Sequence, residues 1–335
     1  MQANTRAKLT QRINRLCQRF NEPVIPAGHV QKWLRHFDAE DRAAALTLLE
    51  AVEYHTYPRL VRESQQLHAK VRRRLAADGF DAVKFQDVDF SREFTCKSGD
   101  LLSFIYRKAN LIPSIDFKTF DELISEQRAQ AHRFRNRALV LLDDYIGTGS
   151  QFIFQFVGQS PADLAVLNGY RRIYLACVVA HEQALKKFRL LQARRIRAVM
   201  TLEEEQFPQV DFRDQEQRLR AALRHLEWKK VHCLPLIEER PLLAPGASRL
   251  TAQQRRQIHQ LVAKYQPGGY DGTSYLFGHH TFFHGAPNAL PHMLLQFFKR
   301  VEDLSIYPAD KVAGLEPSSV TLYDFERAPR RSGRG

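Results

Sequence analysis

The stretch from Leu139 to Gln151 reads LVLLDDYIGTGSQ and decides the fold class. It opens with four apolar residues, 139–142, which are typical of a strand buried on both faces of a parallel sheet. The carboxylates of Asp143 and Asp144 follow directly, and a glycine-containing turn comes next. Ligands of parallel sheets bind beyond the carboxyl ends of the strands. The segment therefore predicts a ligand site at the edge of a buried sheet.

The turn after the two acids has the chemistry of an anion site. It consists of Gly147, Thr148, Gly149 and Ser150. The glycines can adopt positive φ and let a phosphate approach the backbone closely, while the hydroxyls add donors. An apolar, helix-like run at 152–157 follows, and the first turn of a helix favours anions. Because the acids would repel a bare phosphate, we expect them to accept hydrogen bonds from the hydroxyls of a ribose.

These thirteen residues resemble the binding motif of type I phosphoribosyltransferases, which has four apolar residues, two acids, two apolar residues and a Thr/Gly turn. The resemblance implies that Asp143 and Asp144 hold the ribose hydroxyls of phosphoribosyl pyrophosphate (PRPP). It implies that the 5-phosphate is held by the turn and the next residue, that is by Gly147, Thr148, Gly149, Ser150 and Gln151. Gln151 stands where the family usually has threonine, which weakens the case for turnover.

The alternative interpretation is a buried strand followed by a polar helix cap, with the two acids serving as surface charge. That interpretation leaves adjacent acids at the end of a buried strand unexplained.

A second loop candidate is Lys97, Ser98 and Gly99, which lie between a predicted strand at 83–90 and a predicted amphipathic helix at 101–108. In phosphoribosyltransferases a short loop in this place binds pyrophosphate through backbone amides. The resemblance therefore implies a pyrophosphate loop here, with Mg²⁺ accompanying PRPP or a nucleotide pyrophosphate. An ordinary helix cap by Ser98 fits the same residues equally well.

Alternating strands and helices predict an α/β fold, with strands at 83–90, 138–142, 173–180 and 197–202 and helices between them. Together with the resemblance of the motif, this implies a parallel-sheet, type I phosphoribosyltransferase-like (Rossmann-like) domain with a helical N-terminal domain. We expect a helical N-terminal region at 1–80, the phosphoribosyltransferase-like domain at 81–326 and a basic, disordered tail at 327–335.

The segment 268–291 is rich in glycine, histidine and aromatic residues. His279, His280 and His284 suggest a metal site, but no cysteine or carboxylate lies nearby at a zinc-binding spacing. We therefore expect no metal ligated by the protein. The remaining interpretations are a contact to a nucleobase or sugar, with amides such as Asn288, and a plain strand followed by a proline turn.

This segment also resembles the C-terminal signature of a phosphoribosyltransferase-like group from bacterial conflict systems, some of which accompany the reverse transcriptases of retrons. The features are a strand, then Pro287-Asn288 and Leu290-Pro291, and with the earlier motifs they extend over roughly residues 29–298. The resemblance implies an effector or associated protein of a retron-type anti-phage defence system. Its partners would include PRPP or a nucleotide, and the reverse transcriptase with its branched RNA-DNA product, msDNA.

The bulk composition is that of a globular protein with a basic surface. The chain has 335 residues, 44% hydrophobic content and a net charge of +13. No apolar run is long enough for a membrane span, the N-terminus lacks a secretory leader, and the four cysteines are scattered, so we expect a cytoplasmic location. Cations cluster at 186–197 and after Glu326, which favours contact with polyanions.

Three functions remain open on these residues. The first is an enzyme, either a phosphoribosyltransferase or one acting on the N-glycosidic bond of a nucleotide. The second is a catalytically inactive module that senses a nucleotide. The third is a nucleic-acid scaffold that binds msDNA. The sequence leaves the acceptor base, the direction of reaction and oligomerisation undecided.

Overall fold

The computed structural model describes most of the chain up to residue 298. The described residues are 2–20, 25–92, 98–113, 117–129, 134–150, 152–153, 158–206, 212–246, 250–265, 278–282, 290, 293–294 and 297–298. Among them, no helix has both the length and the apolar character needed to cross a membrane.

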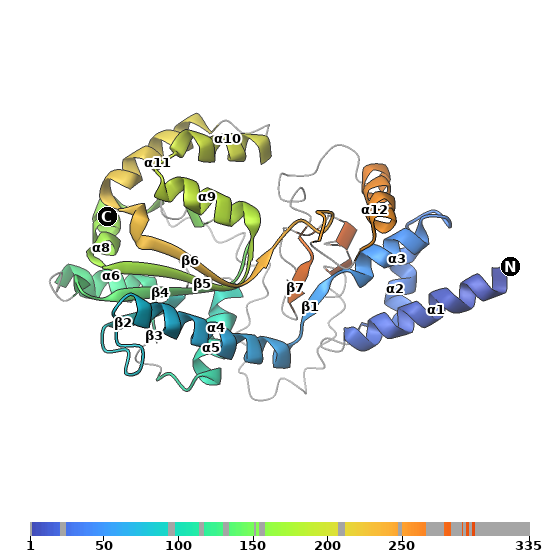
Figure 1. Cartoon of the computed structure of the whole chain (residues 1–335), viewed down its shortest axis with the longest axis horizontal. Helices are drawn as coiled ribbons and strands as arrows, with labels where there is room; N and C mark the ends of the chain where they lie inside the picture. Colours follow the sequence, from blue (N-terminus) through green and yellow to red (C-terminus); the bar gives the residue numbers. More distant parts are fainter. Residues whose placement is uncertain are drawn as a thin grey trace, which may run out of the picture.

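A five-stranded sheet, here called the central sheet, forms the middle layer of the larger lobe (Figure 1), and all its strands are parallel. In spatial order the strands are β3 (Phe117–Lys118), β2 (Val88–Arg92), β4 (Ala138–Ile146), β5 (Arg172–His181) and β6 (Val231–Glu239). The two central strands, β4 and β5, are almost wholly buried and rich in Leu, Val and Ala. Such runs suit strands covered on both faces. The predicted α/β fold with a parallel sheet is confirmed.

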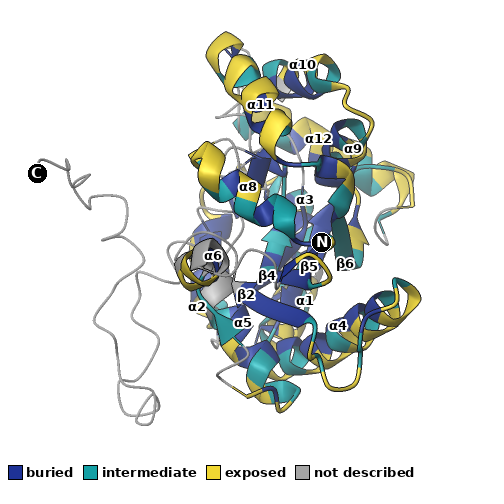
Figure 2. Ribbon diagram, turned by 90° about the vertical axis from the view of Figure 1, so that its left-hand side faces the viewer, coloured by how far each residue is buried: buried dark blue, intermediate teal, exposed yellow. Residues whose placement is uncertain are grey.

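Helices cover both faces of this sheet (Figure 1). On one face, α4 (Tyr57–Ala77) and α5 (Ser98–Ala109) pack against alternate strand residues such as Val140 and Leu142. The helices on the other face are α6 (Phe120–Ala129), α8 (Pro161–Gly169), α9 (Glu182–Gln192), α10 (Ile196–Gln206) and α11 (Arg213–His225). The outer faces of α4 and α11 remain exposed (Figure 2).

The strand order has a reversal point between β2 and β4. The chain runs from β2 outwards to β3 and then returns to β4, on the other side of β2. In doubly wound sheets, ligands bind at the carboxyl ends of the strands on either side of such a point. Asp143 and Asp144 lie in the last four residues of β4, so the topology places the predicted acids near the preferred ligand position of the fold.

A second lobe is built from the two ends of the described chain. It contains α1 (Gln2–Arg19), α2 (Ala27–Leu34), α3 (Arg42–Glu50) and α12 (Ala252–Tyr265), and a two-stranded parallel sheet of β1 (Glu53–His55) and β7 (His280–Phe282). Its core joins residues 13–54 to residues 242–298. Figure 1 shows this lobe beside the carboxyl ends of β5 and β6. We expected the helical N-terminal region to extend to residue 80, which would include α4. In the structure, α4 packs on the central sheet.

Two sequence predictions about local structure differ from the result. The segment 197–202, predicted as a strand, is part of α10, because Ile196, Val199 and Met200 recur at helical spacing and face the core. The predicted strand at 83–90 is shifted, since β2 begins only at Val88, after turns that include Phe85 at positive φ. The β6 strand and its preceding 3-10 turn, Trp228–Lys230, were not predicted.

Candidate functional site

The two predicted loops start from neighbouring strands. Arg92, the last residue of β2, is paired with Leu142, immediately before the two aspartates in β4. Ser98 and Gly99 begin α5, the next described element after β2. Lys97 and Gln151 lie outside the described residues. The topology therefore brings the start of α5 and the Asp143-Asp144 segment to the same edge of the sheet.

The aspartates lie within β4, not after it. Asp143 is half-buried and Asp144 is 4% exposed. Each carboxylate accepts the backbone N–H of the following residue, at 2.9 Å for Asp143 and 2.8 Å for Asp144. These bonds fix the carboxylates close to the strand, at the height where β2 has already ended.

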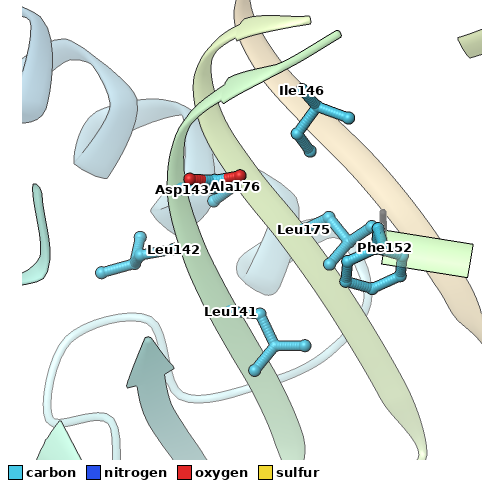
Figure 3. A pocket seen from close by; sticks show the side chains of 7 residues that line it. All are labelled: Leu141, Leu142, Asp143, Ile146, Phe152, Leu175 and Ala176. Atoms are coloured by element: carbon cyan, nitrogen blue, oxygen red, sulfur yellow. The ribbon is translucent and has the colours of Figure 1, made fainter. Parts of the chain in front are cut away.

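The alternation of β4 changes phase across the aspartates. Leu142 and Tyr145 both pack with the core under α4 and α5, although they are three residues apart, and Ile146 returns to the opposite core. Strict alternation would send residues three apart to opposite faces. Figure 3 shows the ribbon of β4 curving beyond Asp143. The bend changes the direction of both carboxylates relative to the alternating apolar side chains that precede them in β4.

The turn after β4 is held tightly against α9. Gly149 has φ +73°, and a Cβ there would lie 3.2 Å from Cβ of Ala184 and 3.3 Å from its Cα. Only glycine satisfies both the positive φ and the close approach. Among the described residues, the backbone N–H groups of Thr148 and Gly149 donate no hydrogen bond, whereas that of Ser150 donates to Thr148 Oγ1 at 3.0 Å. Unused, adjacent amides in such a turn suit an anion.

The hydroxyl of Ser150 points into a buried ion pair. Ser150 Oγ donates to Glu203 at 2.8 Å and accepts from Lys187 Nζ at 3.0 Å. Lys187 Nζ lies 2.9 Å from Glu203 Oε1, and both charged side chains are 0% exposed. Burial lowers the pKa of Lys187, and the neighbouring carboxylate opposes that shift. We call Ser150, Lys187 and Glu203 the serine cluster; it anchors the turn from below and takes the Ser150 hydroxyl away from any phosphate.

The space directly beneath Asp143 is a packing gap. It has no room for a water molecule. Leu141, Ile146, Phe152 and Leu175 surround it (Figure 3). A sugar phosphate would therefore have to approach from the carboxyl edge of the sheet, over the turn.

A second buried polar group lies at the end of β6. It consists of His55, Glu63, Tyr145, Glu239, His279 and His280, and we call it the histidine cluster. Glu239 accepts the Tyr145 hydroxyl, and its Oε1 accepts the backbone N–H of His279 at 2.5 Å and of His280 at 3.2 Å. His280 Nδ1 lies 2.8 Å from His55 Nε2. His55 Nδ1 lies 2.7 Å from Glu63 Oε2.

Burial sets the protonation of the histidine cluster. It lowers the pKa of His279 to about 4 and that of His280 to about 2, so both rings are neutral at pH 7. Burial raises the pKa of Glu239 to about 7, although the Tyr145 hydroxyl and two backbone N–H groups oppose the rise. The pKa of Tyr145 itself is raised well above its usual value by burial and by Glu239.

The sequence singled out two of the six members of this cluster, His279 and His280. The predicted strand around His280 and Phe282 is confirmed as β7, while His284 and Asn288 lie outside the described residues. Glu239 was missed because forty residues separate it from His279, and only the fold brings them together. Its one sequence signal is a pair of acids, Glu238 and Glu239, at the end of a largely apolar run.

Comparison with known proteins identifies a family. The model of the PRTase-CE family matches residues 30–296, which is most of the chain. No curated protein and no solved structure matches this chain.

Proposed function

The chain belongs to the PRTase-CE family and is a phosphoribosyltransferase-like protein, and from that premise we propose that it binds PRPP or a nucleotide containing ribose 5-phosphate. The observation that carries the proposal is the position of Asp143 and Asp144. They lie near the carboxyl end of β4, beside the strand-order reversal and two residues before a turn in which the N–H groups of Thr148 and Gly149 donate no hydrogen bond among the described residues. The carboxylates would accept the ribose hydroxyls, and the amides of the turn would hold the 5-phosphate.

Mg²⁺ would enter this site with the pyrophosphate of the ligand. Carboxylate oxygens such as those of Asp143 fit a hard cation, which is usually held by one or two carboxylates together with phosphate oxygens. When bound, the ion would neutralise charge on the pyrophosphate. The chain itself would contribute positioning: aspartates that orient the sugar, and a turn that the serine cluster keeps in shape.

The activity that follows is making or breaking the bond at the anomeric carbon of the ribose, as a phosphoribosyltransferase or as an enzyme of nucleotide N-glycosidic bonds. A nucleotide sensor without turnover is the second candidate. It is favoured by the Ser150 hydroxyl, which is already engaged by Lys187 and Glu203. In either form, we propose an effector or associated role in a retron-type anti-phage system, in which the reverse transcriptase and its msDNA would be partners.

Calorimetry with PRPP and Mg²⁺ tests ligand binding. We expect binding by the unmodified chain and a loss of at least about 100-fold for the double variant Asp143→Asn/Asp144→Asn, because two charge-assisted hydrogen bonds to the ribose are removed. Asp214→Asn is the matched control, since Asp214 is exposed on α11 and pairs only with Arg218 among the described contacts. Equal binding by the double variant and the unmodified chain would refute the proposal.

Turnover separates the two candidates. Release of pyrophosphate or of a free base, lost in the same double variant, supports the enzyme. Binding without either product supports the sensor. A gel shift with branched DNA at two salt concentrations addresses the scaffold, whose affinity should fall steeply as salt is added.

A further inference from the structure

The histidine cluster has the composition and spacing of a metal site. One ligand atom each from Glu239, His279 and His280 can be chosen so that all three atoms lie within 4.8 Å of one another. All three residues are buried, at 1%, 6% and 5% exposure. Two imidazoles and one carboxylate are a donor set that proteins use for Zn²⁺ and related divalent ions.

His279 supplies the observation that points to a ligand. Its Nδ1 is buried and has no hydrogen-bond partner among the described residues. The carboxylate oxygen Glu239 Oε1 lies 3.3 Å from Nδ1 of His279. A neutral imidazole and a carboxylate at that distance do not form an ion pair, but ligands of a tetrahedral ion with bonds near 2.0–2.2 Å are roughly 3.3 Å apart. Buried nitrogen atoms without a partner are uncommon in folded proteins.

The groups behind the three residues are those that support metal ligands. His280 contacts His55 through Nδ1, so Nε2 is the ring nitrogen left for a ligand. His55 is in turn held by Glu63. Glu63 accepts from Arg59 Nε at 2.8 Å. Ligating histidines usually engage their second ring nitrogen in this way, which fixes the tautomer and the ring orientation. Glu239 is oriented in the same manner by the Tyr145 hydroxyl.

We propose that Glu239, His279 and His280 bind a divalent transition-metal ion of the Zn²⁺ class. The ion would join the end of β6 in the central sheet to β7 in the second lobe. The other acid-rich group, Asp38, Glu40 and Asp41, lacks this character because it is largely exposed and already contacts Lys264. The proposal is independent of PRPP, since none of the three ligands lies in the turn or among the paired aspartates.

The first test uses the unmodified chain, purified without a polyhistidine tag. We expect elemental analysis to find one equivalent of Zn²⁺ after dialysis, and Zn²⁺ to raise the melting temperature of the chelator-treated protein. Co²⁺ should give the intense visible absorption of a tetrahedral site. If the treated protein takes up no Zn²⁺, shows no rise in melting temperature and gives no such Co²⁺ spectrum, the proposal is overturned.

The second test uses variants that distinguish the metal ligands from the residues that orient them. Glu239→Gln and His279→Gln should each lose the bound equivalent, and His55→Gln should weaken Zn²⁺ binding by about 10- to 100-fold. The matched control is His68→Gln, because His68 is a half-buried histidine that contacts Tyr106 and not this cluster. Full Zn²⁺ occupancy in folded Glu239→Gln and His279→Gln would overturn the assignment of these ligands.

Discussion

The serine cluster and the histidine cluster are both buried, both contain ionisable side chains and both lie near carboxyl ends of strands in one sheet, yet their polar groups are paired to different degrees. In the serine cluster, Lys187, Glu203 and the Ser150 hydroxyl all contact one another within 3.0 Å. In the histidine cluster, a chain of contacts from Glu63 to His280 is complete, but Nδ1 of His279 has no hydrogen-bond partner among the described residues.

This difference in hydrogen bonding distinguishes a structural cluster from a binding site. A buried ion pair with every group paired holds its segments in one arrangement, and removing one member leaves an unpaired charge. A buried polar group that lacks a partner lowers stability unless something else binds it. We therefore assign the serine cluster to the support of the turn, and the histidine cluster to binding. The following predictions test that contrast, starting with the largest effect.

Replacing Lys187 by Met should lower the free energy of unfolding by about 3–5 kcal/mol, because Glu203 would stay buried without its cation. Urea unfolding followed by circular dichroism measures the change. The double variant Lys187→Met/Glu203→Leu should recover much of the loss, since it buries no unpaired charge. A loss below about 1 kcal/mol in the single variant would show that Glu203 is hydrogen-bonded by other groups, so that the serine cluster is not self-contained.

Gly149→Ala should lower the free energy of unfolding by about 2–3 kcal/mol, from the strain of positive φ and the 3.2 Å approach to Ala184. PRPP binding should fall with it, because the turn must move away from α9. Gly28→Ala is the matched control: its Cβ would meet nothing within 4 Å in α2, so the change should be neutral or slightly stabilising. Similar destabilisation in both variants would argue against a special role for the turn.

Tyr145→Phe tests the histidine cluster, again through the free energy of unfolding. Removing the hydroxyl leaves Glu239 Oε2 without its donor, so we expect a loss of roughly 1–2 kcal/mol in metal-free protein. Thermal unfolding with chelator present measures it. The same experiment with Zn²⁺ should show a smaller loss, because bound metal would stabilise the carboxylate. An equal loss in both conditions would indicate that metal and Glu239 do not interact.

The smallest effect is expected from His68, a histidine whose ring is paired. Its Nδ1 lies 2.8 Å from the Tyr106 hydroxyl, and burial, followed by repulsion from Arg72, lowers its pKa to about 4. The unfolded chain, with a pKa near 6.5, binds the proton first as the pH falls, so stability is lost between pH 6.5 and 4. We expect His68→Gln to reduce this loss by about 1–2 kcal/mol, allowing for partial solvent exposure. Unfolding curves at pH 7 and pH 4.5 measure it, and an unchanged pH dependence would contradict the shift.

The sequence predicted the parts of the site that are contiguous. The apolar run, the two acids and the turn follow one another at 139–150, an apolar run predicted the buried strand at 173–180, and the alternation of elements placed a helix after it. The segment 197–202 was predicted wrongly because a short apolar run does not distinguish a strand from one face of a helix.

Long-range pairing limited the rest. Lys187 belongs to the cluster of cations at 186–197 that favoured contact with polyanions, and only the approach of Glu203 from the next helix explains why it is buried. Glu239 and His279 are joined through the pairing of β7 with β1, which no local pattern encodes. A site assembled from distant strand ends becomes visible only when the fold is known.

The pairing of β1 with β7 has a consequence for how the chain is made. Residues 53–55 leave the ribosome more than two hundred residues before 280–282, and the apolar faces of α1 to α3 are completed only by residues 242–298. The central sheet can assemble while synthesis continues, but the first helices must wait, with their hydrophobic faces uncovered, for almost the entire translation time. Premature termination before residue 290 would leave apolar surface of those helices exposed. Truncated products should therefore be prone to aggregation and rapidly degraded.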